Sequence, residues 1–195
     1  MSIFFLYLLA LSGAYLVGSV PTGFLIARLA GIADIRHHGS GNIGATNVAR
    51  IVGKKFFALV LLLDAGKAYG YLAFLAIHGV SKEFLCLVAL ALLLGNSASI
   101  FLRFSGGKGV ATSVGCLLFL MPWIVAAALG VWLVVLVITR TVGFASVAAA
   151  LCAVVFGAIV LSKQNDPVAL TSIVMALWVV LLHKKNMYSL AASRQ

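Results

Sequence analysis

Residues 123–138 read WIVAAALGVWLVVLVI, an apolar run long enough to cross most of a lipid bilayer as a helix. Similar runs recur along the 195-residue chain, of which 64% is hydrophobic and only 9% charged, with a mean hydropathy of +1.18. A water-facing surface needs far more charge than this. Lipid offers the backbone no hydrogen-bond partners, so each run must close its own bonds as a helix. The sequence therefore predicts an all-α integral membrane protein.

The apolar segments can be placed along the whole chain. We expect them at 3–30, 56–79, 84–102, 110–120, 123–138, 142–161 and 167–182. The stretch 110–138 has two interpretations: one long crossing, or a hairpin of two short segments broken at Met121-Pro122, because proline interrupts a helix. No soluble domain or low-complexity linker separates the segments, which indicates one membrane domain over residues 1–195.

The placement of basic residues favours the hairpin. With seven segments, the second side of the membrane carries only Lys82 and Lys163. The first side carries eleven basic residues: Arg28, Arg36, Arg50, Lys54, Lys55, Arg103, Lys108, Arg140, Lys184, Lys185 and Arg194. Lys and Arg concentrate in cytoplasmic loops, so we expect about seven transmembrane or membrane-embedded helices, the N-terminus outside and the C-terminus cytoplasmic. The net charge of +10 then belongs to these loops, and we expect no nucleic-acid partner.

The few polar residues gather in short segments, the first of which reads GSGNIGATNVAR over residues 39–50. Its closely spaced glycines allow backbone N–H groups to converge on an anion, and an arginine adds a fork that matches phosphate oxygens. An ordinary Gly-rich turn between helices is the alternative, but the added polar side chains favour a phosphate site. The candidate ligands are Gly39, Ser40, Gly41, Asn42, Asn47 and Arg50.

A second Gly-rich segment, SGGKGVAT, covers residues 105–112 where a loop runs into a helix. Free N–H groups at a helix start attract an anion, and a lysine beside them adds charge. The segment is not a nucleotide P-loop, because Leu102 replaces a glycine and Gly109 replaces the magnesium-binding Ser or Thr. A flexible turn with one topology-setting lysine is the alternative. The candidate residues are Gly106, Gly107, Lys108, Gly109 and Thr112.

Two polar pairs and several absences complete the inventory. His183 and Asn186 would share a helical face near the C-terminus, and Asp64 with Lys67 forms an intramembrane pair that is either functional or structural. The only acids are Asp34, Asp64, Glu83 and Asp166, too scattered for a carboxylate-rich metal site, and the histidines lack zinc-ligand spacing. We therefore expect no metal and no cofactor. The residues alone predict a metal-free phosphate site in a membrane, without assigning a reaction.

The motifs resemble those of the bacterial acyl-phosphate:glycerol-3-phosphate acyltransferases. Residues 39–50 are similar to that family's GSGNxGAxNVxR signature and residues 104–112 to its FxGGKGVAT signature. Weaker similarities are found at 18–21, at the Asp64-x-x-Lys67 pattern, at 139–147 and at His183-x-x-Asn186. The likeness spans nearly the whole chain.

The resemblance implies a seven-segment fold in the bacterial plasma membrane and a reaction between two phosphate-bearing substrates. A fatty acyl group would pass from acyl phosphate to the sn-1 hydroxyl of glycerol 3-phosphate, without a covalent acyl-enzyme, and a donor phosphate oxygen would take the proton. A soluble enzyme that makes the acyl phosphate is a possible partner. The implied catalytic residues are Ser40, Arg50, Lys108, Ser146, His183 and Asn186, supported by Asp64, Lys67 and Asn96.

The chain also departs from the family pattern. Asn96 and Ser99 replace a usual His and Pro, Gly143 replaces a Ser, and Ser189 replaces an Arg. These changes leave both Gly-rich segments whole, but they keep a catalytically weakened paralogue or a non-catalytic scaffold as alternatives. A small transporter for an anionic metabolite is a further alternative, since intramembrane charges are common there.

Overall fold

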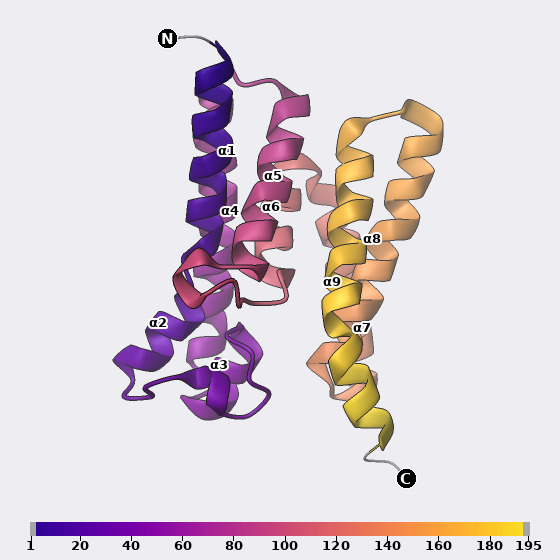
Figure 1. The fold of residues 1–195 in the computed structure, drawn as a ribbon. Coiled ribbons are helices and arrows are strands. Elements are labelled where there is room, and N and C mark those ends of the chain that lie inside the picture. Colours follow the sequence, from indigo (N-terminus) through magenta and orange to yellow (C-terminus); the bar gives the residue numbers. More distant parts are fainter. Residues whose placement is uncertain (1–2, 193–195) are drawn as a thin grey trace. The chain divides into compact units, whose positions relative to one another are not determined.

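The protein is described from a computed structural model that covers residues 3–192, with side chains described for 4–184. Its elements, shown in Figure 1, are α1 (Ile3–Ser19), α2 (Thr22–Leu29), η1 (Ile35–His37), α3 (Ala45–Ile51), α4 (Phe56–Ile77), α5 (Lys82–Ser97), η2 (Ile100–Leu102), α6 (Val110–Leu120), α7 (Pro122–Thr139), α8 (Val142–Gln164) and α9 (Pro167–Ala192). The predicted all-helical membrane class is confirmed.

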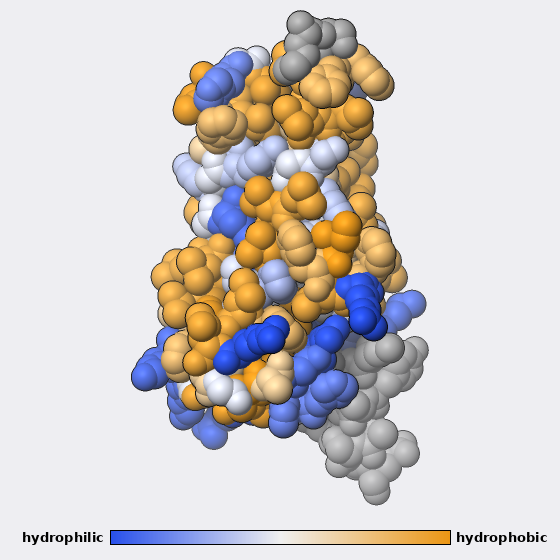
Figure 2. Space-filling view, turned by 60° about the vertical axis from the view of Figure 1, so that its left-hand side comes forward, coloured by the Kyte–Doolittle hydropathy of each residue, from blue (hydrophilic) through white to orange (hydrophobic). Residues whose placement is uncertain are grey.

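Within the residues that the structure describes, five helical stretches are long and apolar enough to cross a membrane: Phe4–Leu29, Phe56–Ile77, Pro122–Thr139, Val142–Gln164 and Pro167–Lys184. Helix α6 is apolar but shorter. The face in Figure 2 is largely hydrophobic, and its hydrophilic side chains gather toward the lower end, where α2 and α3 lie in Figure 1. Exposed large side chains such as Leu62 and Phe74 therefore belong to a surface that contacts lipid. Seven crossings and the orientation of the termini stay predictions.

The chain divides into two compact units, Met1–Cys116 and Leu117–Gln195. In the first unit, α1 packs along α5, and α4 contacts α1, α3 and α5. In the second unit, α8 packs against both α7 and α9. The single membrane domain expected over residues 1–195 stays a prediction.

Helices α1 and α5 approach closely because each helix places a glycine against the backbone of the other. A Cβ atom on Gly18 would collide with the backbone of Leu92, and one on Gly95 would collide with the carbonyl oxygen of Tyr15. Small residues permit such close helix packing in membranes. The Ser99 hydroxyl then donates to the Ser19 carbonyl oxygen at 2.6 Å. The C-terminal end of α5, which precedes the second Gly-rich segment, is thereby fixed to α1.

The segment expected at 3–30 is not one helix, because it breaks between Ser19 and Thr22. Pro21 lacks an N–H, so the backbone there cannot continue the helical ladder. The Lys67 ammonium donates to the carbonyl oxygen of Val20 at 2.7 Å and to that of Gly18 at 3.1 Å. The break expected at Met121-Pro122 is present, since α6 ends at Leu120 and α7 begins at Pro122; the hairpin topology across it stays a prediction.

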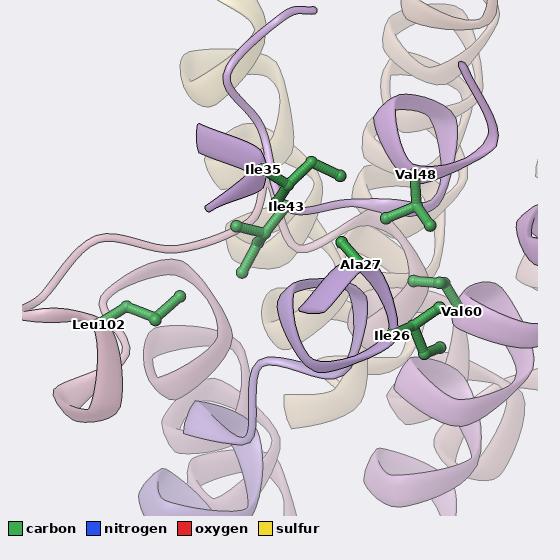
Figure 3. Packing of buried hydrophobic residues seen from close by; sticks show 7 residues of the cluster. All are labelled: Ile26, Ala27, Ile35, Ile43, Val48, Val60 and Leu102. Carbon is green, nitrogen blue, oxygen red and sulfur yellow. The ribbon is translucent and has the colours of Figure 1, made fainter. Parts of the chain in front are cut away.

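A hydrophobic cluster supports the segment between α2 and α3. Ile35 and Ile43 from this segment are buried beside Leu102 of η2, as Figure 3 shows. Helix α2 comes so close beneath the segment that a Cβ on Gly23 would collide with the Ile43 carbonyl oxygen. Ile26, Ala27, Val48 and Val60 complete the cluster. The cluster holds the first Gly-rich segment and η2 together.

Candidate active site

The first Gly-rich loop, residues 39–44, is built around the side chain of Asn47. This side chain belongs to α3 and is only 2% exposed. Its Oδ1 accepts from the Ser40 backbone N–H at 3.0 Å, and its Nδ2 donates to the carbonyl oxygens of His38 and Asn42, both at 2.9 Å. Because both ends of the amide are engaged, Asn47 fixes the loop from within. The Ser40 side chain stays exposed.

The loop uses several of its own backbone N–H groups. Gly44 N–H donates to Asn42 Oδ1 at 2.9 Å, and Gly41 N–H donates to the His38 carbonyl oxygen at 3.1 Å. Gly39 and Gly41 have φ values of 60° and 70°, which glycine adopts without strain. A bound phosphate would therefore meet side chains, chiefly the exposed Ser40 and Arg50, more than the convergent N–H groups suggested by the sequence.

The second Gly-rich loop, residues 105–109, lies directly on the end of α5. Gly107 N–H donates to the Asn96 carbonyl oxygen at 2.9 Å, and a Cβ on Gly106 would collide with that same oxygen. Gly109 has a φ of 77°, and a Cβ there would collide with Leu93. The Asn96 side chain also faces this loop, since its Oδ1 would lie 3.1 Å from a Cβ on Gly107. The glycines are thus needed for close backbone packing.

Lys108 is partly buried in the second loop, and burial lowers the pKa of its ammonium group. Neither Lys108 nor Arg50 forms an ion pair with a carboxylate within the described part of the chain. A partly desolvated cation without a carboxylate attracts an external anion. The two cations predicted to bind phosphate therefore keep their charges available.

Thr112 lies in the first turn of α6, directly after the second loop. Its Oγ1 is buried and has no hydrogen-bond partner within the described part of the chain. Buried hydroxyls in proteins almost always find a partner. Thr112 is 0% exposed, so its role in phosphate binding stays a prediction.

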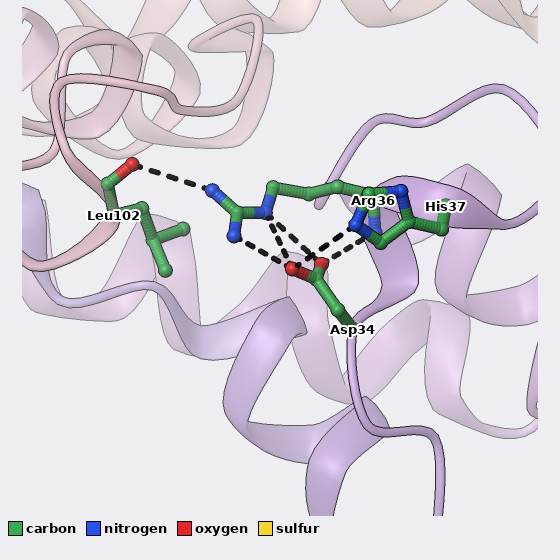
Figure 4. Close-up of polar contacts among 4 residues, drawn as sticks. All are labelled: Asp34, Arg36, His37 and Leu102. Atoms are coloured by element: carbon green, nitrogen blue, oxygen red, sulfur yellow. Dashed lines mark hydrogen bonds and ion pairs between the residues drawn. The ribbon is translucent and has the colours of Figure 1, made fainter.

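The structure pairs two residues that the sequence does not single out as site residues, Asp34 and Arg36, shown in Figure 4. Arg36 Nη2 donates to Asp34 Oδ2 at 2.6 Å and Arg36 Nε donates to Asp34 Oδ1 at 3.0 Å, while Nη1 donates to the Leu102 carbonyl oxygen at 3.3 Å. The hydrogen bond from the Arg36 guanidinium lowers the Asp34 pKa from 3.8 to about 2. A signal for this pair is present in the sequence: Asp34 precedes Arg36 by two residues, and Asp is a preferred N-cap residue whose side chain accepts from a backbone N–H of the first turn.

Asp64 and Lys67 bind the chain at the break between α1 and α2. Their side chains lie 2.7 Å apart and are almost fully buried, and Thr22 Oγ1 donates to Asp64 Oδ1 at 2.6 Å. With the Lys67 bonds to the Gly18 and Val20 carbonyl oxygens, this is the geometry of a structural pair. The pair supports α2, on which the first loop rests.

The second unit carries Ser146 on α8 and His183 on α9, both buried. Trp132 Nε1 donates to Ser146 Oγ at 3.4 Å, and His183 Nδ1 lies 2.8 Å from the Val179 carbonyl oxygen, so Nδ1 carries a proton. Along their helices, Ser146 is about 27 Å from Gln164 and His183 is about 24 Å from Pro167. Because α8 and α9 form an antiparallel pair joined at 165–166, both residues lie toward the same end of that pair.

The remaining predicted positions are quickly placed. Gly143 lies in the first turn of α8. Asn186 and Ser189 fall where side chains are not described. Within the described part of the chain, no three His, Cys, Asp or Glu side chains lie together as a metal site.

An apolar groove in the first unit is lined by residues of α2, η2 and the break before α2. It has a volume of about 370 Å³ and is lined by Val20, Pro21, Phe24, Leu25, Arg28, Phe101 and Leu102. Phe24 also lies under the Arg36 guanidinium, whose carbon is 5.7 Å from the ring centroid. The groove therefore adjoins the contact between Arg36 and Leu102.

Known proteins are similar to this chain in sequence. The family profile described as glycerol-3-phosphate acyltransferase matches residues 8–193. A glycerol-3-phosphate acyltransferase of Synechococcus sp. (strain JA-2-3B'a(2-13)) is 44% identical over 96% of this chain and 92% of its own length, and one of Desulforudis audaxviator (strain MP104C) is 49% identical over 73% and 72%.

Solved structures agree with this assignment. The crystal structure of PlsY (YgiH), an integral membrane glycerol 3-phosphate acyltransferase, in its glycerol 3-phosphate form superposes with a TM-score of 0.87 at 35% identity, covering 97% of this chain and 94% of that one. Its lysophosphatidic acid form gives a TM-score of 0.84 at 34% identity, covering 97% and 93%. The resemblance stated from the motifs is confirmed, and the chain belongs to the glycerol-3-phosphate acyltransferase family.

Proposed function

We propose that this membrane acyltransferase moves a fatty acyl group from acyl phosphate to the sn-1 hydroxyl of glycerol 3-phosphate, releasing phosphate and lysophosphatidate. The observation that carries the proposal is the pair of cations, Arg50 and Lys108, that have no carboxylate partner among the described residues and flank two rigid Gly-rich loops. Each of two phosphate-bearing substrates would be stabilised by pairing with such a cation. The glycerol 3-phosphate and lysophosphatidic acid forms of a solved relative support the acceptor and the product.

An acyl phosphate as the donor is compatible with the residues of the site. An acyl phosphate carries its own leaving group, so attack by the glycerol hydroxyl oxygen on the acyl carbon forms the ester as the carbon–oxygen bond to phosphate breaks. The departing phosphate takes the hydroxyl proton. Lys108 and Arg50 offset negative charge as it develops on phosphate, and the loops hold the reactants in place. This scheme needs no covalent acyl-enzyme and no cofactor.

We also assign Ser146, His183 and Asn186 to hydrogen bonds with a substrate phosphate or the reacting hydroxyl, because the family resemblance implies these roles. Ser40 and Thr112 provide further hydroxyl donors in the first unit.

The apolar groove suits the acyl chain of the donor. Its side chains are apolar except for Arg28, and two of them, Phe24 and Leu102, belong to residues that contact Arg36. Lipid tails are as apolar as these side chains, so the groove would orient a chain more than attract it. The phosphate end of the donor would then lie toward the Gly-rich loops.

Turnover by purified protein tests the function. We expect phosphate release from palmitoyl phosphate that depends on glycerol 3-phosphate, with 1-acyl lysophosphatidate formed. Palmitoyl-CoA supplied instead should be inert. Acyl transfer from the CoA ester alone would overturn the donor, and a 2-acyl product would overturn the regiochemistry. If folded protein shows no turnover with either donor, a weakened paralogue or a transporter would be favoured. Transport would then have to be measured in sealed vesicles.

We also propose the bacterial plasma membrane as the location, with seven crossings that put the Gly-rich loops on the cytoplasmic side. The asymmetry of Lys and Arg across the segments supports this orientation. Single cysteines placed in loop 103–109 and near Lys82 of a variant lacking native thiols should react oppositely with a membrane-impermeant reagent added outside intact cells. Labelling of loop 103–109 from outside would reverse the topology.

A further inference from the structure

Arg36 precedes the first Gly-rich loop and reaches the turn before the second, but its guanidinium is already ion-paired with Asp34. Its guanidinium is paired with Asp34 through bonds of 2.6 Å and 3.0 Å, and the Arg36 backbone N–H donates to Asp34 Oδ1 at 2.9 Å. The pair is partly buried, with side chains 32% and 22% exposed. Arg36 therefore differs from Arg50 and Lys108, since its bound carboxylate leaves little charge for a substrate phosphate.

What Arg36 does reach is the backbone of η2. Its Nη1 donates to the Leu102 carbonyl oxygen at 3.3 Å, a contact that joins residues far apart in the sequence. The same carbonyl oxygen accepts from the Ser105 N–H at 3.3 Å. One oxygen thus connects η1, which precedes the first Gly-rich segment, with the turn that begins the second Gly-rich loop.

That turn is strained. Arg103 and Phe104 have φ values of 56° and 59°, a left-handed conformation that bulky side chains rarely adopt. Such residues persist only where the surroundings over-determine them. Here the Phe104 N–H donates to the Ser99 carbonyl oxygen at 2.8 Å, and the Leu102 carbonyl oxygen receives bonds from Ser105 and Arg36. The turn leads directly into Ser105–Gly109, which carries Lys108.

From this geometry we propose that Arg36 is a positioning residue that sets the place of Lys108 relative to the first Gly-rich loop. The proposal rests on the proposed function for its kinetic consequences. Asp34 fixes the Arg36 side chain, Phe24 packs under its guanidinium, and Leu102 receives its remaining bond. Replacement by lysine would keep the positive charge but lose the planar guanidinium, which donates to Asp34 and to the Leu102 carbonyl oxygen at the same time.

The direct test is hydrogen exchange of residues 103–109 in detergent-solubilised protein, which does not depend on activity. In Arg36→Met, we expect the amides of Phe104 and Ser105 to exchange about tenfold faster or more, because the turn loses a charged donor. The Gly107 amide, bonded to Asn96, should change less. Lys54→Met removes an exposed cation from a nearby loop and should leave this exchange unchanged.

Kinetics provide the functional test. We expect Arg36→Met to raise KM for both substrates and lower kcat, about tenfold in kcat/KM or more. Arg36→Lys should recover only part of this loss, while Lys54→Met keeps wild-type values. Unchanged exchange at Phe104 and Ser105 in Arg36→Met overturns the proposal. So does a loss of activity that only tracks the folded fraction, with both KM values unchanged. A wild-type protein without turnover overturns the proposed function instead, and the exchange result still decides the role of Arg36.

Discussion

The Asn47 side chain and the Ser40 backbone N–H are 3.0 Å apart and joined by a hydrogen bond that closes the first Gly-rich loop. The same amide group donates to two carbonyl oxygens of the loop, those of His38 and Asn42. One buried side chain of α3 thus decides the shape of a loop that precedes it in the sequence. Asn47 thereby fixes the position of Ser40, and its predicted contact with a substrate phosphate stays a prediction.

Replacing Asn47 with Asp should therefore be severe. The new oxygen would face two carbonyl oxygens, leaving both without a donor in a buried place, at a cost of about 2 kcal/mol or more. We expect a lower thermal midpoint in detergent and loss of turnover. The matched control is Asn165→Asp at an exposed helix end, where midpoint and activity should stay at wild type. A normal midpoint in Asn47→Asp would contradict this role.

Lys108→Ala should abolish turnover, since the cation offsets charge at the leaving phosphate. Lys108→Arg should retain part of the activity. Burial lowers the Lys108 pKa from its ordinary 10.5, so the neutral form arises at lower pH than for an exposed lysine. The rate should therefore fall on the alkaline side below pH 10.5 in the wild type, and this limb should move upward in Lys108→Arg. A pH–rate profile of both proteins checks this, and near-normal activity of Lys108→Ala would refute the scheme.

Lys67→Met should destabilise the first unit by about 3–5 kcal/mol, because it leaves the buried Asp64 carboxylate without its partner. It also strips a donor from the Gly18 and Val20 carbonyl oxygens. The double variant Asp64→Asn with Lys67→Met removes both charges and should lose less than the single variant. Thermal unfolding of the three proteins measures the difference. Equal losses in both variants would mean that the charge itself is not what matters.

The Asp34–Arg36 pair should make the loop region sensitive to acid. The Asp34 pKa is about 2 in the folded protein and near 3.8 otherwise, so the folded state binds fewer protons. The stabilisation is fully present above pH 3.8 and is lost as the pH falls toward 2. The difference in thermal midpoint between wild type and Asp34→Asn should be constant above pH 4 and shrink below it. A difference that instead grows with acid would contradict the pairing.

Filling the apolar groove should change the choice of donor. Val20→Trp places a large ring on the groove wall, so the ratio of kcat/KM for palmitoyl phosphate over decanoyl phosphate should fall roughly tenfold. Leu62→Trp, on the exposed face of α4, should leave the ratio unchanged. Competition between the two donors in one reaction measures it directly. An unaltered ratio in Val20→Trp would place the acyl chain elsewhere.

Local sequence features gave reliable predictions where one physical effect dominates. The segment 110–120 coincides with α6, and the break at Pro122 follows from the missing N–H of proline. The equally simple break at Pro21 was missed, because the surrounding apolar run masked it. Residues 45–51 form α3, which the sequence does not predict as a helix, because this stretch is too short to show a helical period.

By itself, the sequence determined the membrane class, the family and the two Gly-rich segments, because hydropathy and contiguous motifs are local properties of a chain. Only the tertiary structure decided which polar groups are available. It engages both ends of the Asn47 amide inside the loop, pairs Arg36 with Asp34 and leaves Arg50 and Lys108 without a carboxylate among the described residues. The physical reason is that a hydrogen bond or ion pair depends on distances of about 3 Å between groups whose separation in sequence does not reveal them.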